Sequence, residues 1–208
     1  MTAPTVPYAT LLGFARFVDR TGPAKATFVG GLRRARERRS GFNPHGPLVK
    51  ALKSEIAFHG AGSYLRSAAE AVKPRWQPLY AALLPGALAY LETVAPQTQL
   101  AQTRDAIGVV GGLPVKINPH FGLRRPDGGA EAVRLYLDEQ PPSPETVLAT
   151  LHLMARHMDQ VLPHAEPVLV DVRRGVVHRT DPAVKADQVE RWLAGEAAAF
   201  SATWSAAA

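Results

Sequence analysis

Two short segments of this sequence carry, at every second residue, side chains able to move protons, hold a metal ion or bind an anion. They are Lys116, Asn118 and His120 in the first segment, and Arg134, Tyr136 and Asp138 in the second. Successive side chains of a β-strand point to opposite faces. Each set is therefore predicted to share one face of a strand, and pairing of the two strands with these faces aligned would form one polar patch.

Such a patch supports more than one chemistry. His120 is suited to proton transfer, and His120 together with Asp138 to metal binding. Lys116 and Arg134 are suited to anion binding. An antiparallel sheet with one solvated face produces the same alternation with no function at all. The residues alone leave these alternatives open.

The surrounding sequence predicts the elements that position the patch. Apolar residues at helical spacing or in alternation predict the following segments. The helices are 8–19, 23–39, 48–72, 75–94, 143–162 and 182–204; the strands are 103–110, 113–118, 132–138, 167–172 and 176–180. This order predicts an α+β fold, with an N-terminal helical layer and an αβββαβ-type core that ends in a β-hairpin and a helix.

Glycine, proline and serine residues predict where these elements turn or begin. Gly111-Gly112 is typical of a two-residue hairpin loop. The pair Pro85-Gly86 predicts a kink or a division in the helix that spans 75–94. Ser143 is predicted to cap the helix that follows it.

Composition and charge narrow the class of protein. A chain of 208 residues without cysteine forms no disulfide and no thiolate metal site. The net charge is +6, yet residues 1–53 alone hold ten Lys or Arg against two acidic residues, so the remainder is net acidic. We therefore divide the chain into a basic helical segment, 1–47, and an α+β core, 48–208, within one compact unit. The absence of a signal pattern and of a long apolar run predicts a cytoplasmic, bacterial protein without a membrane partner.

The basic segment ends in the sequence LRRARERR. A helix that contacts nucleic-acid phosphates has this composition. We predict that the nucleic-acid-binding residues are Arg33, Arg34, Arg36, Arg38, Arg39, Lys116 and Arg134. The same arginines also fit an acidic protein partner or a solvated helix face.

The element order resembles the core of the PD-(D/E)XK nuclease superfamily, which includes the RecB-type exonuclease domain. Pro119-His120 stands at the place of the family's Pro-Asp motif. Either 134–136 or 136–138 stands at the place of its Glu/Asp-x-Lys motif. Glu55 corresponds to an acidic residue that some members carry on the preceding helix. The resemblance covers residues 48–205.

This sequence departs from the family pattern at the residues that hold the metal. His120 replaces the first acid, and strand 132–138 contains no Glu/Asp-x-Lys. The resemblance implies a nuclease-like fold whose metal centre is lost or remodelled. A remodelled centre would use Glu55, His120, Tyr136 and Asp138 as catalytic residues, with Mg²⁺ or Mn²⁺; otherwise we expect no cofactor.

Our leading hypothesis is a non-catalytic, nuclease-like protein that binds DNA or RNA through its basic helical segment. An interaction module with an acidic protein partner is one alternative, and a metal-dependent nuclease is another. Two Asn-Pro-His triplets, which begin at Asn43 and Asn118, we treat as coincidental.

Overall fold

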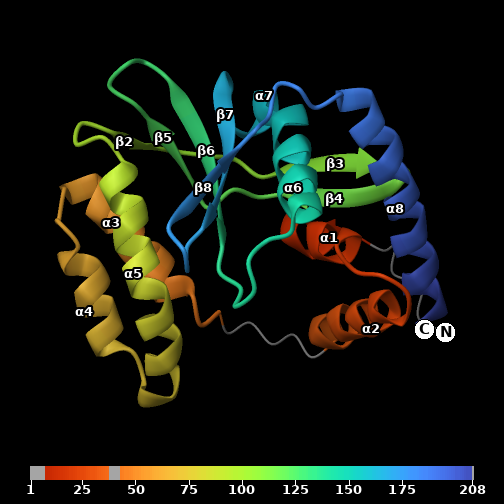
Figure 1. Cartoon of the computed structure of the whole chain (residues 1–208), viewed down its shortest axis with the longest axis horizontal. Coiled ribbons are helices and arrows are strands. Elements are labelled where there is room, and N and C mark those ends of the chain that lie inside the picture. Colours follow the sequence, from red (N-terminus) through yellow and green to blue (C-terminus); the bar gives the residue numbers. More distant parts are fainter. Residues whose placement is uncertain (1–7, 38–42, 208) are drawn as a thin grey trace.

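The computed structural model describes residues 8–37 and 43–207 of the chain (Figure 1). Its elements in chain order are β1 (Ala9–Thr10), α1 (Leu11–Val18), α2 (Pro23–Glu37), α3 (Gly46–Phe58), α4 (Ser63–Ala71), the 3₁₀ turn η1 (Pro74–Trp76), α5 (Gln77–Thr93), β2 (Gln99–Ala101), β3 (Ala106–Val110), β4 (Leu113–Ile117), β5 (Phe121–Arg124), β6 (Ala130–Tyr136), α6 (Pro144–Arg156), α7 (Met158–Val161), β7 (Ala165–Asp171), β8 (Val176–Arg179) and α8 (Ala186–Ala206).

The larger sheet has five strands in the order β2-β5-β6-β7-β8. Neighbouring strands are antiparallel except β6 and β7, which are parallel. Parallel neighbours need a crossover connection, and α6 supplies it. With helices before these strands and α8 after them, the chain has the predicted α+β fold. The strands that precede α6 in this sheet are β2, β5 and β6, whereas the prediction used 103–110, 113–118 and 132–138.

A smaller sheet has the order β1-β4-β3. It joins the β3–β4 hairpin, which lies in the chain between β2 and β5, to β1 near the start of the chain. Its hairpin turns at Gly111 and Gly112, as predicted, and both have positive φ angles, 50° and 84°. The predicted pairing of strand 113–118 with strand 132–138 is wrong, because β5 occupies the place beside β6. The buried side chains of β3 and β4 pack with α1 and α8, which holds their hairpin in a sheet of its own.

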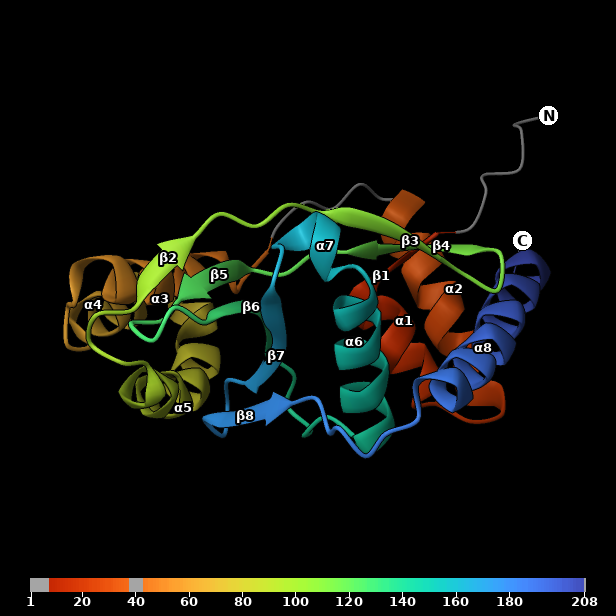
Figure 2. The same cartoon turned by 90° about the horizontal axis from the view of Figure 1, so that it is seen from above.

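Two large clusters of buried apolar side chains divide the interior. One surrounds the smaller sheet and draws on α1, α2, α6 and α8. The other lies between the larger sheet and the helices α3–α5. Figure 2 shows α3, α4 and α5 at one end of the molecule, α1, α2 and α8 at the other, and β6, β7 and α6 between them. The division of the chain after residue 47 stays a prediction, although α2 packs on the C-terminal α8.

Some helix predictions need correction. The predicted helix 48–72 is two helices, because His59, Ala61 and Gly62 have positive φ angles and reverse the chain between α3 and α4. Segment 143–162 likewise divides into α6 and α7, while Ser143 caps α6 as predicted and accepts from the Thr146 N–H at 3.0 Å. The last helix begins at Ala186, later than predicted.

Of the two alternatives predicted at Pro85-Gly86, a kink or a division, the division is wrong, because α5 continues through Pro85. Burial of its apolar side chains against the sheet offsets the hydrogen bond that proline removes. Gly86 permits the close approach, since a Cβ there would lie 2.1 Å from the Val172 carbonyl oxygen and 2.6 Å from the Arg173 carbonyl carbon. The turn between β7 and β8 is thereby held against α5. None of the helices within the described residues combines the length and apolar character that a membrane crossing requires.

Candidate functional site

β6 presents two chemically different faces. Val133 and Leu135 belong to the core beneath α3–α5. Tyr136 instead packs with Leu12 of α1 and with α6, and alternation places Arg134 on that same side. The predicted alternation along this strand is therefore confirmed.

Polar residues from five parts of the chain gather around the end of β6. We call this set the Arg134 cluster: Arg16 of α1, His45 before α3, Asn118 and His120 between β4 and β5, Arg134, Tyr136 and Asp138 of β6 and the segment after it, and Arg173 after β7.

His120 acts as a strand partner where β5 begins. Its backbone N–H donates to the Val133 carbonyl at 2.8 Å, and its Nδ1 accepts from the Leu135 N–H at 3.0 Å. Burial, together with the nearby charges of Arg134 and Lys53, lowers the pKa of His120 to about 3. The imidazole is therefore neutral at pH 7, and its Nδ1 lone pair is occupied, which leaves it poorly suited to act as a general base.

Arg134 is a deeply placed cation without a carboxylate partner among the described residues. It donates through Nη1 to the Asn118 carbonyl, and its buried Nε has no hydrogen-bond partner in the described part of the chain. Burial, and then the positive charge of Arg16, lower the pKa of Arg134 to about 10, while Asp105 opposes the shift. Positive charge is thus in excess around this guanidinium.

Arg16, Tyr136 and Asp138 form the more exposed side of the cluster. Arg16 pairs with Asp138 at 2.5 Å, and the Arg16 guanidinium carbon lies 5.8 Å from the centre of the Tyr136 ring. Burial and the Asp138 carboxylate raise the pKa of Tyr136 to about 12. The Tyr136 phenol therefore remains protonated and donates a hydrogen bond to the Asp138 carboxylate.

Further polar atoms of the cluster are buried without a partner in the residues described. They are Nε of Arg16, Nε of Arg173, Nδ1 of His45 and Oδ1 of Asn118. Burial lowers the pKa of His45; Arg173 and Arg16 add to this effect, and Asp138 opposes it. Buried polar atoms are nearly always hydrogen-bonded, so a group of unpartnered polar atoms at one place suggests a ligand or ordered water.

Glu55 lies outside the cluster and has a structural role. Its carboxylate accepts from the Gly62 N–H at 3.0 Å and from the Leu65 N–H at 2.9 Å, and the residue is 1% exposed. It therefore satisfies N–H groups at the start of α4, where no local side chain does so. The predicted catalytic set consequently divides: the structure gathers His120, Tyr136 and Asp138 but not Glu55.

The residues of the Arg134 cluster do not fit a magnesium or manganese ion. Such ions require several oxygen ligands. Asp138 is paired with Arg16, and Glu55 is occupied at α4. Within residues 8–37 and 43–207, no group of three or more His, Asp or Glu side chains is placed to hold a metal.

The predicted nucleic-acid-binding residues are also distributed differently from the expectation. Lys116 pairs with Asp105 at 2.7 Å in the smaller sheet, whereas Arg134 lies in the cluster. Arg33 pairs with Glu37 at 3.4 Å and donates to the Trp204 carbonyl at 3.3 Å.

The other arginines of α2 differ in their surroundings. Arg36 lies over the Tyr8 ring at 3.8 Å and the Trp204 ring at 4.6 Å, so it packs α2 against its neighbours. Arg34 is exposed. Arg38 and Arg39 lie outside the described residues.

Arg16, His45 and Arg173 are members of the cluster that the sequence did not predict. Of these three residues, only His45 could have been found from the sequence. It belongs to an Asn-Pro-His triplet, as His120 does, and the structure places both histidines in this cluster. Arg16 and Arg173 belong to an amphipathic helix and a turn, and neither segment has a motif that distinguishes them.

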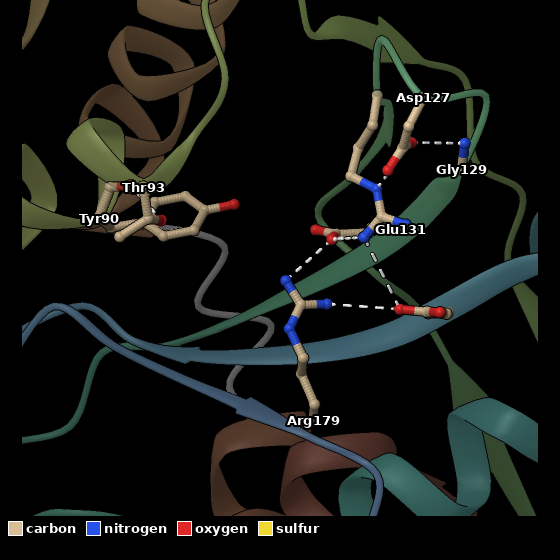
Figure 3. A network of polar contacts seen from close by, with 8 residues as sticks. Tyr90, Thr93, Asp127, Gly129, Glu131 and Arg179 are labelled. Atoms are coloured by element: carbon tan, nitrogen blue, oxygen red, sulfur yellow. Dashed lines mark hydrogen bonds and ion pairs between the residues drawn. The ribbon is translucent and has the colours of Figure 1, made fainter.

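A second polar network occupies the opposite face of β6 (Figure 3). Glu131, 7% exposed at its side chain, accepts from Arg125 and from Arg179, each at 2.9 Å. The same arginines reach Glu166 at 3.9 and 3.5 Å, and Arg125 also pairs with Asp127. Two guanidiniums and three carboxylates thus satisfy one another.

No protein-family model matches the sequence, and no curated protein is significantly similar to it. Function must therefore be inferred from the chemistry of the Arg134 cluster.

Proposed function

We propose that this protein binds nucleic acid without cleaving it, and that it holds a backbone phosphate at the Arg134 cluster. The observation that carries the proposal is the buried Arg134 guanidinium, which has an unpartnered Nε and no carboxylate partner within the described residues. Charged groups are costly to bury unless they are paired. A phosphate oxygen would supply the missing partner.

The composition of the cluster favours phosphate as the anion. Arg16, Arg134 and Arg173 each carry a buried, unpartnered Nε. Guanidinium groups bind phosphate through paired N–H donors. The neutral His120 adds no positive charge, and the Tyr136 phenol is engaged with Asp138, so the guanidiniums are the groups that would bind the anion. Asp138 is the one acid of the cluster, and it is already bound by Arg16.

A nucleic acid is favoured over a small phosphate by the wider charge distribution. The basic residues are concentrated in the first 53 positions, and Arg34 of α2 remains exposed. A polyanion can contact such a surface and the cluster together, and each additional phosphate contact strengthens binding in a salt-dependent manner. This proposal moves the main contact from α2, where Arg33 and Arg36 are engaged within the protein, to the end of β6.

The experiment measures the affinity of labelled DNA and RNA oligonucleotides between 50 and 200 mM salt by fluorescence anisotropy. Arg134→Met and Arg173→Gln should each weaken binding about tenfold and reduce the salt slope by about one unit. Arg124→Gln is the matched control, since it removes the same charge from an exposed position at the end of β5.

Equal losses in Arg134→Met and Arg124→Gln would mean that only net charge matters, and the proposed site would be wrong. Absence of nucleic-acid binding at low salt, combined with binding of poly-L-glutamate, would instead favour the acidic protein partner. Magnesium-dependent cleavage of either oligonucleotide would overturn the non-catalytic part of the proposal.

A further inference from the structure

A second candidate binding site lies away from the Arg134 cluster, between α6, β8 and the segment that leads into α8. A cavity of about 610 Å³, partly open to solvent, lies there. Its walls include the apolar side chains of Val147, Leu148, Leu151 and Val184. The volume falls within the range of roughly 300–1,000 Å³ that is common for small-molecule sites.

Two histidines from different elements line this apolar cavity: His152 of α6 and His178 of β8. Nε2 of each is buried, and neither atom has a hydrogen-bond partner among the residues described. The closest carboxylate oxygen to His152 Nε2, in Glu190, lies 3.9 Å away, beyond hydrogen-bond distance. The cavity thus combines apolar walls with two unsatisfied imidazole nitrogens.

The surroundings indicate an uncharged ligand. Burial lowers the pKa of His152; Glu190 opposes this effect, and Arg156 adds to it, so its imidazole is neutral at pH 7. Arg179 at the wall is already paired with Glu131 and Glu166, and Asp181 accepts from the Ala183 N–H at 2.8 Å. The positive charge at the wall is therefore paired within the protein, and the remaining charged group, the Asp181 carboxylate, is exposed to solvent. A hydroxyl group has one donor and two acceptor sites, so it can bridge two imidazoles when at least one of them carries its proton on Nε2.

We infer that this cavity binds a mostly apolar, uncharged molecule through a hydroxyl group that hydrogen-bonds to His152 and His178. The inference is independent of the proposed nucleic-acid binding, because no residue of the Arg134 cluster lines this cavity. Apolar walls supply the binding energy, and the two imidazoles select for the hydroxyl.

The test uses 4-phenylphenol and biphenyl, two probes that differ only in the hydroxyl group, with the full-length protein in equilibrium dialysis. We expect saturable binding of 4-phenylphenol, about tenfold tighter than binding of biphenyl. In the double variant His152→Leu/His178→Leu, the two probes should bind with equal affinity, because the apolar walls remain and the hydrogen-bond partners are gone.

A second variant tests the location. Ala155 is an exposed residue of α6 at the cavity wall, so Ala155→Trp fills the space without disturbing the core. It should weaken binding of both probes at least tenfold, whereas unfolding by urea stays close to that of the unmodified protein. No saturable binding of 4-phenylphenol, equal affinity for both probes in the unmodified protein, or a preference that persists in the double histidine variant would each overturn the inference.

Discussion

Glu131 and Arg134 belong to the same strand and face opposite sides of the same sheet, and the charges around them are organised in opposite ways. Around Glu131, two guanidiniums are shared among three carboxylates. Around Arg134, the described residues bring together three guanidiniums and the carboxylate of Asp138, which Arg16 already binds. The first network is complete within the protein, and the second retains unused donors.

This difference separates a structural network from a candidate binding site. A buried charge that is fully paired is compensated within the folded protein. Removing one partner leaves an uncompensated charge behind, which destabilises the fold. A buried cation with unused donors raises the free energy of the unliganded protein, and a bound anion would lower it. Stability and binding are therefore expected to respond oppositely to substitutions in the two places.

The largest effect is expected from Glu131→Gln. The change leaves Arg125 and Arg179 without their most buried carboxylate and should lower the free energy of unfolding by about 3 kcal/mol. Urea unfolding at pH 7 measures the loss. Glu166→Gln is the control, because the Glu166 side chain is 60% exposed and its loss should cost less than about 1 kcal/mol. A smaller loss for Glu131→Gln than for Glu166→Gln would contradict the structural role of the network.

The contrast between these two faces was only partly predictable. The alternation along 132–138 correctly placed Arg134 and Tyr136 on one face, and Gly111-Gly112 correctly predicted a hairpin. Both predictions depend only on residues that are close together in the sequence. β5 escaped prediction because Phe121, Gly122 and Leu123 are buried in succession and give no alternating pattern.

The residues that complete the site could not be predicted for a related reason. Glu55 looked like a catalytic acid because a sequence shows the carboxylate and not the chain reversal at His59 that brings N–H groups to it. Arg16, His45 and Arg173 come from segments far apart in the chain. Only the packing of α1, α3 and the β7–β8 turn around β6 places their side chains together.

The next largest effect concerns pH and His120. Its pKa is about 3 in the folded protein, against 6.5 for an ordinary histidine, so the unfolded chain binds the proton more tightly. The stabilisation is complete above pH 6.5 and is lost as the pH falls toward 3. The free energy of unfolding should therefore fall by about 2 kcal/mol between pH 7 and pH 5.

His120→Gln provides the comparison, because the glutamine oxygen can still accept from the Leu135 N–H but does not titrate. Urea unfolding of both proteins from pH 7 to pH 5 should show the steeper decline in the unmodified protein. Parallel curves would mean that His120 is not held neutral by its surroundings.

A smaller and opposite effect on stability is expected from Arg134→Met. Methionine fills similar space without a charge, so the free energy of unfolding should stay within about 1 kcal/mol of the unmodified value or increase. Oligonucleotide affinity should fall, as proposed above. A loss of several kcal/mol would show that Arg134 is paired in solution and would make its surroundings equivalent to those of Glu131.

The smallest effect on stability is expected from Asp138→Asn. The direction of its effect on oligonucleotide affinity distinguishes the two functions considered for this site. The Arg16–Asp138 pair is about one-third exposed on each side, so its loss should cost less than about 1 kcal/mol and should disappear at 1 M salt. Removing this carboxylate frees Arg16 and makes the cluster more positive, so oligonucleotide affinity should rise about two- to threefold at low salt. A metal ligand at this position would behave differently, because its loss would abolish magnesium-dependent binding or cleavage. Anisotropy titrations of the Asp138→Asn variant with and without Mg²⁺ therefore distinguish the two sites. Oligonucleotide affinity rises for an anion-binding cluster, whereas magnesium-dependent binding is lost for a metal centre.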